Sequence, residues 1–188
     1  MIFEKHSNLS GQHAFLSASG YHWLFYDDEK LLDVYEKHLA KEKGTKLHAL
    51  AAELIDMGIK LPDSPQTLNR YVNDAIGFKM TTEQVLFYSI DCFGTADAIC
   101  FRNNVLRIHD LKTGSAPTSM NQLLVYAALF CLEYKYKPSE LDDIILRIYQ
   151  NDEIQEMHAT AADIVPVMDK IVTFSKKLHR YRREVMGI

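Results

Sequence analysis

The sequence predicts an α/β fold of the α+β kind, in which a mixed central sheet is flanked by helices. The hydrophobic spacing is helical over 29–57 and becomes strand-like at residue 82. Three short β-rich runs then follow one another, and the rest of the chain reads as helix, strand, strand and helix. The chain shows no repeat, linker or change of composition, so we expect one domain over residues 1–188.

The helical segment at 29–57 has apolar residues at spacings of three and four. Gly44 is expected to divide it into two helices or to bend it, and Gly58 is expected to end it. The prolines and the aspartate of LPDSPQ, at 61–66, predict a loop, and a short helix is predicted over 65–76.

The β-rich part of the chain consists of three runs bounded by turn-forming residues, at 82–90, 92–101 and 105–113. Asn103 and Asn104 tolerate left-handed backbone, which suits the tight turn of a hairpin. We therefore expect the second and third runs to lie side by side as antiparallel strands.

The C-terminal part is predicted to contain a helix, two strands that pair with each other, and a last helix, over 118–134, 141–150, 153–159 and 161–184. Thr118 or Ser119, behind Pro117, is expected to open the first of these helices. Lys137 and Pro138 follow its end.

The composition, with 47% hydrophobic and 24% charged residues, is that of a folded globular chain. No apolar run approaches the roughly 20 residues that span a bilayer, so we expect no membrane association and a cytoplasmic location. Cys92, Cys100 and Cys131 are widely spaced and form no CxxC pair. They predict buried thiols in a reducing compartment rather than a zinc or iron–sulfur site.

The formal net charge of −4, from 21 basic and 25 acidic residues, gives no general sign of nucleic-acid binding. The stretch 168–188 is nevertheless locally basic, and its cations include Lys176, Lys177 and Arg180. Two interpretations fit this stretch: a solvated helix face, or a surface that follows a phosphate backbone.

Two aspartates and a lysine gather near the predicted hairpin. Asp110 and Lys112 are two residues apart in a strand, so their side chains emerge on one face. Asp97 lies in GTADAI among small and apolar residues, where an unpaired carboxylate would be costly. Two carboxylates held close repel unless a cation lies between them, and oxygen ligands suit Mg²⁺ or Mn²⁺. An exposed ion pair for DxK and a turn or cap role for Asp97 are the alternatives.

Gln122 and Tyr126 are four residues apart on the helix that follows this strand, so both lie on one helical face. Their polar tips can reach a common ligand. Alternatively, Ser119 and Gln122 form a capping box, and Tyr126 is a core aromatic with its hydroxyl at the surface.

Three motifs in this order, GTADAI, DLKTG and QLLVY, resemble the PD-(D/E)XK nuclease superfamily, in particular its RecB-like exonuclease branch of the CRISPR-associated or phage recombination type. That branch is marked by a GxxD strand, a (D/E)xKTG strand and a QxxxY helix, here Gly94 to Asp97, Asp110 to Gly114 and Gln122 to Tyr126. KGTKLHALAAE at 43–53 is similar to a GTxxH motif of the same branch. The resemblance implies a restriction-endonuclease-like αβββαβ core.

The resemblance also implies a metal site, formed by His48, Asp97, Asp110 and the main-chain carbonyl of Leu111. Glu53 or Glu83 would be a further outer ligand. A lone histidine on an apolar helix face is otherwise a satisfied core residue, and this remains the alternative for His48.

Lys112 would orient or activate the attacking water, and Gln122 and Tyr126 would position the DNA backbone or that water. The implied cofactor is Mg²⁺ or Mn²⁺. No iron–sulfur cluster is expected, because members that carry one use four cysteines flanking the nuclease core and this chain has three, placed elsewhere.

The implied activity is divalent-metal-dependent hydrolysis of DNA phosphodiester bonds, by an exonuclease acting from DNA ends in recombination, repair or phage DNA processing. The implied partners are DNA, further copies of the chain and a single-strand annealing or recombination protein, inside a bacterial or phage-infected host cell. A catalytically silent nucleic-acid-binding or assembly module and a structure-selective endonuclease on the same fold are the alternatives.

Overall fold

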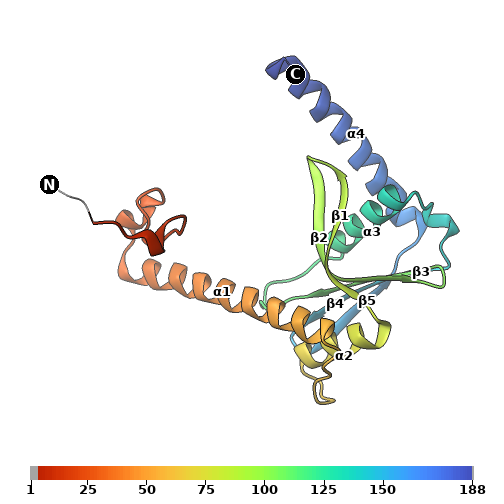
Figure 1. The fold of residues 1–188 in the computed structure, drawn as a ribbon, viewed down its shortest axis with the longest axis horizontal. Coiled ribbons are helices and arrows are strands. Elements are labelled where there is room, and N and C mark those ends of the chain that lie inside the picture. The colour runs from red at the N-terminus through yellow and green to blue at the C-terminus, as the bar shows by residue number, and fades with distance from the viewer. Residues whose placement is uncertain (1–3, 188) are drawn as a thin grey trace. The chain divides into compact units, whose positions relative to one another are not determined.

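The computed structural model describes residues 4–187. Within this range the chain forms four α-helices and one five-stranded sheet (Figure 1). The chain divides into two units, one up to Thr45 and one from Lys46 onward. All of the site residues predicted above belong to the second unit. Among the described residues, no helix is both long and apolar enough to cross a membrane.

The first unit contains two 3₁₀ turns, at Ser7–Leu9 and Tyr21–Phe25, and the beginning of α1. Helix α1 as a whole spans Asp28–Asp56 and continues into the second unit. Its aromatic residues cluster: the ring of Phe15 lies 4.8 Å from that of Tyr35 and 5.3 Å from that of His38, measured between centroids. This small cluster packs the N-terminal segment on α1.

Helix α1 runs without a break across Gly44, so the predicted division into two helices at this glycine is wrong. One glycine inside a helix costs only about 1 kcal/mol, and strong helix formers on both sides outweigh it. The helix ends at Asp56, and Gly58, with a φ of 68°, takes up the left-handed conformation that follows many helix ends. The predicted stop at Gly58 is confirmed.

Helix α2 (Thr67–Phe78) begins two residues later than predicted. Gln66 is extended, and the carboxylate of Asp152 accepts the N–H of Thr67 at 2.7 Å, so the helix start is capped from a distant turn. No local pattern reveals such a cap. Lys79, with a φ of 53°, ends the helix in the left-handed region.

The five strands lie in chain order across the sheet, at Thr81–Ser89 (β1), Cys92–Arg102 (β2), Val105–Leu111 (β3), Asp143–Gln150 (β4) and Glu153–His158 (β5). All neighbours are antiparallel except β3 and β4, so the mixed sheet is confirmed. The hairpin between β2 and β3 turns at Asn103 and Asn104, both left-handed, as predicted. The predicted pairing of the last two strands is confirmed as well.

Helix α3 (Asn121–Tyr134) connects β3 to β4, and α4 (Ala161–Met186) follows β5. Helix α3 begins three residues later than predicted. The hydroxyl of Thr118 does not cap the helix, because it donates a hydrogen bond to Oε1 of Gln150 at 3.3 Å. Ser119 still accepts the N–H of Asn121 at 3.2 Å.

Two buried clusters form the core, one for each set of helices. Helices α3 and α4 share one of them with the sheet, and it includes Leu86, Ile99, Ile108, Leu123, Leu146 and Ile164. Helix α2 and the end of α1 share the other, and it includes Ala51, Ile55, Val72, Ala98, Leu111 and Tyr149. The cysteines are free thiols, of which Cys100 and Cys131 are buried and Cys92 is half-buried.

Candidate functional site

The two motif aspartates lie where β2 and β3 part. Main-chain pairing of these strands runs from the hairpin to Ala98 opposite His109 and ends there. Asp97 and Asp110 are the next residues on the two strands, so they occupy facing positions just past the last pair. Oδ2 of Asp97 accepts a hydrogen bond from the N–H of Leu111 at 2.9 Å. This side-chain hydrogen bond takes the place of the next main-chain hydrogen bond between the two strands. Asp97 is therefore a strand residue at a fork in the sheet and not a turn or cap residue.

Asp110 is almost completely buried, with 1% of the residue exposed. Nζ of Lys112 lies 3.1 Å from Oδ1 of Asp110 and 2.9 Å from its Oδ2. Only the contact with Oδ1 has the geometry of a hydrogen bond. Within residues 4–187, Oδ2 has no hydrogen-bond partner. Burial raises the pKa of Asp110, and the hydrogen bond from Lys112 opposes this rise. The interpretation of DxK as an exposed ion pair is thus wrong.

His48, on the part of α1 that belongs to the second unit, lies beside Asp97. Its Nδ1 is 3.4 Å from Oδ2 of Asp97, and its side chain is 30% exposed. The hydrogen bond with Asp97 raises the pKa of His48, although burial opposes it. This histidine faces carboxylates and solvent, which does not match a satisfied core histidine.

Glu83 completes a compact group of possible metal ligands. His48, Glu83 and Asp97 each offer one ligand atom, and these atoms all lie within 4.8 Å of one another. Burial raises the pKa of Glu83, and the negative charge of Asp97 adds to the rise. We call these three residues the His48 cluster.

The backbone of Glu83 is unusual for a strand residue. Its φ is 47°, and pairing of β1 with β2 passes from Thr82 opposite Ala98 to Gln84 opposite Ala96 without it. A non-glycine residue in the left-handed region costs about 1–3 kcal/mol, and such residues gather at functional sites. The conformation breaks the ladder at the position that faces Asp97.

The His48 cluster differs from the metal site that the motifs predict. It includes Glu83, which the sequence offers only as an outer ligand, and it does not include Asp110, whose carboxylate is held by Lys112. Glu53 is exposed on α1 and lies outside the cluster. Leu111 gives its N–H to Asp97 and buries its side chain, and its carbonyl as a ligand stays a prediction.

A chain of hydrogen bonds joins the remaining motif residues. Lys112 donates to Oε1 of Gln122 at 2.9 Å, and Nε2 of Gln122 donates to the hydroxyl of Tyr126 at 3.0 Å. Gln122 therefore takes no part in a capping box with Ser119. Burial raises the pKa of Tyr126, which keeps its hydroxyl protonated. Asp110, Lys112, Gln122 and Tyr126 form one connected polar chain.

The motif glycine of β2 makes room for this chain. A Cβ atom on Gly94 would lie 2.9 Å from Cε1 of Tyr126, closer than carbon atoms approach in proteins. The tyrosine ring thus lies directly on the Gly94 backbone, and any side chain at this position would displace it.

The basic residues predicted near the C-terminus lie on α4. Lys176, Lys177 and Arg180 are all exposed. Lys176 and Arg180 line a shallow hollow on the helix together with Arg183, and Lys177 lies outside it. Arg182 is engaged elsewhere, because it donates to Asp91 at the tip of the β1–β2 hairpin at 2.6 Å.

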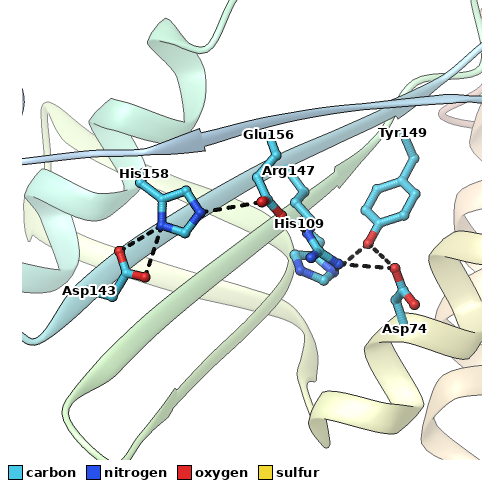
Figure 2. A network of polar contacts seen from close by, with 7 residues as sticks. All are labelled: Asp74, His109, Asp143, Arg147, Tyr149, Glu156 and His158. Carbon is cyan, nitrogen blue, oxygen red and sulfur yellow. Dashed lines mark hydrogen bonds and ion pairs between the residues drawn. The ribbon is translucent and has the colours of Figure 1, made fainter.

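A polar network behind Asp110 has no counterpart in the sequence motifs. It joins α2 with β3, β4 and β5 (Figure 2) through seven residues: Asp74, His109, Asp143, Arg147, Tyr149, Glu156 and His158. Alternation along a strand turns His109 to the face opposite Asp110. The network therefore fixes the back of the strand that carries Asp110.

The hydroxyl of Tyr149 stands at the centre of this network. It donates to Asp74 at 2.7 Å, and Nδ1 of His109 lies 3.2 Å from it. Since the hydroxyl has a single proton, Nδ1 of His109 must be the donor to it, and Nε2 carries no proton. Burial lowers the pKa of His109 to about 3, with the charges of Arg147 and Arg107 adding to the effect. His109 is therefore neutral at pH 7.

The donors gathered at the fork suit a hard divalent cation. Two carboxylates and one imidazole make up the His48 cluster, and carboxylate and imidazole donors are found at Mg²⁺ and Mn²⁺ sites. Oδ2 of buried Asp110 accepts no hydrogen bond within residues 4–187, although Nζ of Lys112 lies 2.9 Å from it, so it is a further oxygen available to a cation. Both observations fit a metal ion at this place.

Comparison of the chain with family models, with curated proteins and with solved structures gives no match.

Proposed function

We propose that the protein is a divalent-metal-dependent DNA nuclease of the PD-(D/E)XK type, most similar to the RecB-like exonucleases. The observation that carries this proposal is the junction of two groups at one fork of the sheet. The His48 cluster includes Asp97, and the polar chain that runs through Lys112 to Tyr126 begins at Asp110, which occupies the position facing Asp97. A binding surface alone needs neither of them.

The order of elements supports the proposal. From α2 to β4 the second unit reads α, β, β, β, α and β, and the sheet is mixed. This is the αβββαβ order that the motif resemblance implies. The two aspartates lie on the second and third strands of that order, next to the fork.

The His48 cluster would hold the divalent ion, and Asp110 would add its Oδ2, which accepts no hydrogen bond within residues 4–187. When bound, such an ion neutralises phosphate charge and lowers the pKa of a coordinated water, which hydrolysis of a phosphodiester needs. The left-handed backbone of Glu83 and the bond from Leu111 to Asp97 hold two of the carboxylates in place. Preorganised ligands of this kind avoid reorganisation during the reaction.

Lys112 supplies a fixed positive charge beside the fork. Its ammonium group is held between the carboxylate of Asp110 and the amide oxygen of Gln122. We assign to it the orientation of the attacking water and the stabilisation of negative charge on the phosphate. Removal of this charge leaves the three residues of the His48 cluster unchanged and deprives Asp110 of its positive partner.

The hydroxyl of Tyr126 is able to donate a hydrogen bond to the substrate. Its hydroxyl oxygen accepts from Gln122, so its own O–H remains available for a phosphate oxygen. Gly94 allows the ring to lie where it does. Gln122 and Tyr126 would thus position the DNA backbone relative to Lys112.

The test is cleavage of end-labelled linear DNA and of closed circular DNA in Mg²⁺, Mn²⁺ or EDTA. We expect loss of linear DNA only, no cleavage in EDTA, and no cleavage by Lys112→Ala. Lys60→Ala is the matched control, because Lys60 is an exposed lysine in a loop away from the fork.

The other outcomes separate the alternative functions. Cutting of circles would make the protein an endonuclease on the same fold. Absence of cleavage by folded protein that binds Mn²⁺ would overturn the nuclease proposal and favour the nucleic-acid-binding module.

A further inference from the structure

A hollow of about 250 Å³ lies at the turn of the β2–β3 hairpin, beside the end of α2. The cations Lys79, Arg102 and Arg107 line it, together with Phe78 and Asn103. No acidic side chain is among its lining residues. The hollow is large enough for a small tetrahedral anion and too small for most drug-sized ligands.

The three cations of the hollow are not neutralised by acidic side chains of the described residues. Among the ion pairs of the described residues, none involves Lys79, Arg102 or Arg107. Arg147, which lies over the same Phe78 ring, is paired with a carboxylate at 3.2 Å. Like charges gathered in one hollow repel unless an anion joins them, so this group lacks its counter-charge.

Arg107 is held in place by an aromatic ring. Its guanidinium carbon lies 4.8 Å from the centre of the Phe78 ring. The ring itself is fixed, because His109 meets it edge-on at 5.7 Å between centroids. A stacked guanidinium keeps its N–H groups free at its edge, where they match the oxygens of a phosphate.

The hairpin brings the two arginines together. Arg102 pairs with Val105 and Cys100 pairs with Arg107, so the arginines are diagonal neighbours on one face. Diagonal neighbours on facing strands have Cβ atoms about 7–8 Å apart, close enough for two long side chains to reach one anion. Lys79, left-handed at the end of α2, joins them from the adjacent helix.

The hollow is separate from the proposed nuclease centre. Arg107 and Asp110 are three residues apart on β3, so their side chains emerge on opposite faces of the sheet. The strand rise puts them about 10 Å apart along the sheet. A ligand in the hollow therefore leaves the fork open.

We propose that this hollow is a phosphate-binding site, formed by Arg102, Arg107 and Lys79. Its ligand is a phosphate group, either of a small free molecule or of a nucleic-acid backbone. The site is independent of the nuclease proposal, because it uses none of the residues at the fork.

The test is a titration of the full chain, in EDTA and at constant ionic strength, followed by amide chemical shifts. Inorganic phosphate is the first probe, chloride the reference, and a single-stranded oligonucleotide without terminal phosphates the second probe. We expect saturable shifts at Gly77–Lys79 and at Arg102–Arg107. In the double variant Arg102→Gln/Arg107→Gln, we expect the Kd to rise at least tenfold.

Lys60→Gln removes an exposed charge elsewhere and should leave the Kd unchanged. Lys79→Gln/Arg102→Gln keeps the Arg107–Phe78 contact and serves as the test if the first variant does not fold. Shifts with both probes assign the site to a nucleic-acid backbone, and shifts with phosphate alone assign it to a free phosphate ligand. Shifts with neither probe, or an equal loss in Lys60→Gln, would overturn the proposal.

Discussion

Glu83 and Asp97 face each other across β1 and β2, yet the strands do not pair at this position because Glu83 has a φ of 47°. The pairs on both sides, Thr82 with Ala98 and Gln84 with Ala96, keep the same register. The ladder is thus interrupted without being shifted. The interruption lies where the carboxylates and His48 come together, so the strained backbone and the proposed metal site coincide.

Two variants, Glu83→Gly and Glu83→Ala, distinguish the effect of the left-handed backbone at this position from the effect of the carboxylate. Both Glu83→Gly and Glu83→Ala remove a proposed ligand, so we expect each to weaken Mn²⁺ binding about tenfold or more. Only alanine must still be forced into the left-handed region, so the glycine variant should be more stable by about 1 kcal/mol. Calorimetric Mn²⁺ titration and urea unfolding measure the two effects. Equal stability of the two variants would show that the left-handed backbone is not held in solution.

Lys112 is expected to stabilise the fold as well as the proposed reaction. Lys112→Met leaves the buried carboxylate of Asp110 without a positive partner, and removal of one partner of a fully buried pair costs about 3–5 kcal/mol. Solvent reaches Lys112, so we expect a smaller loss of about 2 kcal/mol in urea unfolding at neutral pH. Asp110→Asn/Lys112→Met should recover most of the stability and none of the cleavage. A double variant as unstable as the single one would contradict the pairing.

The order of elements follows from the sequence, because each depends on local spacing and on turn residues. The hairpin at Asn103 and Asn104 and the stop at Gly58 are examples, since each needs only a left-handed residue at a fixed place. The start of α2 is different. It depends on Asp152, which is 85 residues away in the chain and lies in the turn between β4 and β5.

In the candidate site too, some contacts follow from local spacing and others depend on residues that are distant in the chain. Gln122 and Tyr126 are bonded to each other, as their spacing of four residues on one helical face allows. The bond from Lys112 to Gln122 joins residues ten apart, on a strand and a helix, and no local spacing predicts it. The sequence motifs offer Glu83 only as an outer ligand. Its place in the His48 cluster depends on its position opposite Asp97 across β1 and β2 and on a backbone angle that no residue pattern encodes. The hairpin register, once assumed, places Glu83 opposite Asp97 and is the signal that would have found it.

Gly94→Ala tests the contact between β2 and Tyr126. The new Cβ would lie 2.9 Å from the ring, so the ring must move away and carry its hydroxyl out of place. We expect roughly ten- to hundredfold slower cleavage of linear DNA, with little change in the thermal midpoint. In a Tyr126→Ala background the ring is absent, and Gly94→Ala should then have almost no further effect. Additive losses in the double variant would show that Gly94 acts through something other than Tyr126.

His158 gives the stability a pH dependence of known sign. Its hydrogen bond to Asp143, then its charge interactions and a contact with Glu156, raise the pKa of His158 above the ordinary value of 6.5. A histidine with a raised native pKa stabilises the fold below the unfolded value, and this contribution is lost as the pH rises through the native value. His158→Gln should therefore lower the thermal midpoint at about pH 5.5 and leave it nearly unchanged at about pH 8.5. His179→Gln, an exposed histidine on α4, is the control. An equal effect of His158→Gln at both pH values would contradict the assignment.

The cations of α4 are expected to act on DNA affinity rather than on the chemical step. Lys176, Lys177 and Arg180 are exposed and do not belong to the polar chain at the fork. Each phosphate contact contributes about 0.9 to the slope of log K against log salt on duplex DNA, so their combined change to Gln should reduce this slope by about 2–3. Cleavage at saturating DNA should stay close to that of the native chain, and Lys60→Gln should change neither quantity. An unchanged slope and affinity at low salt would make this part of α4 a solvated helix face.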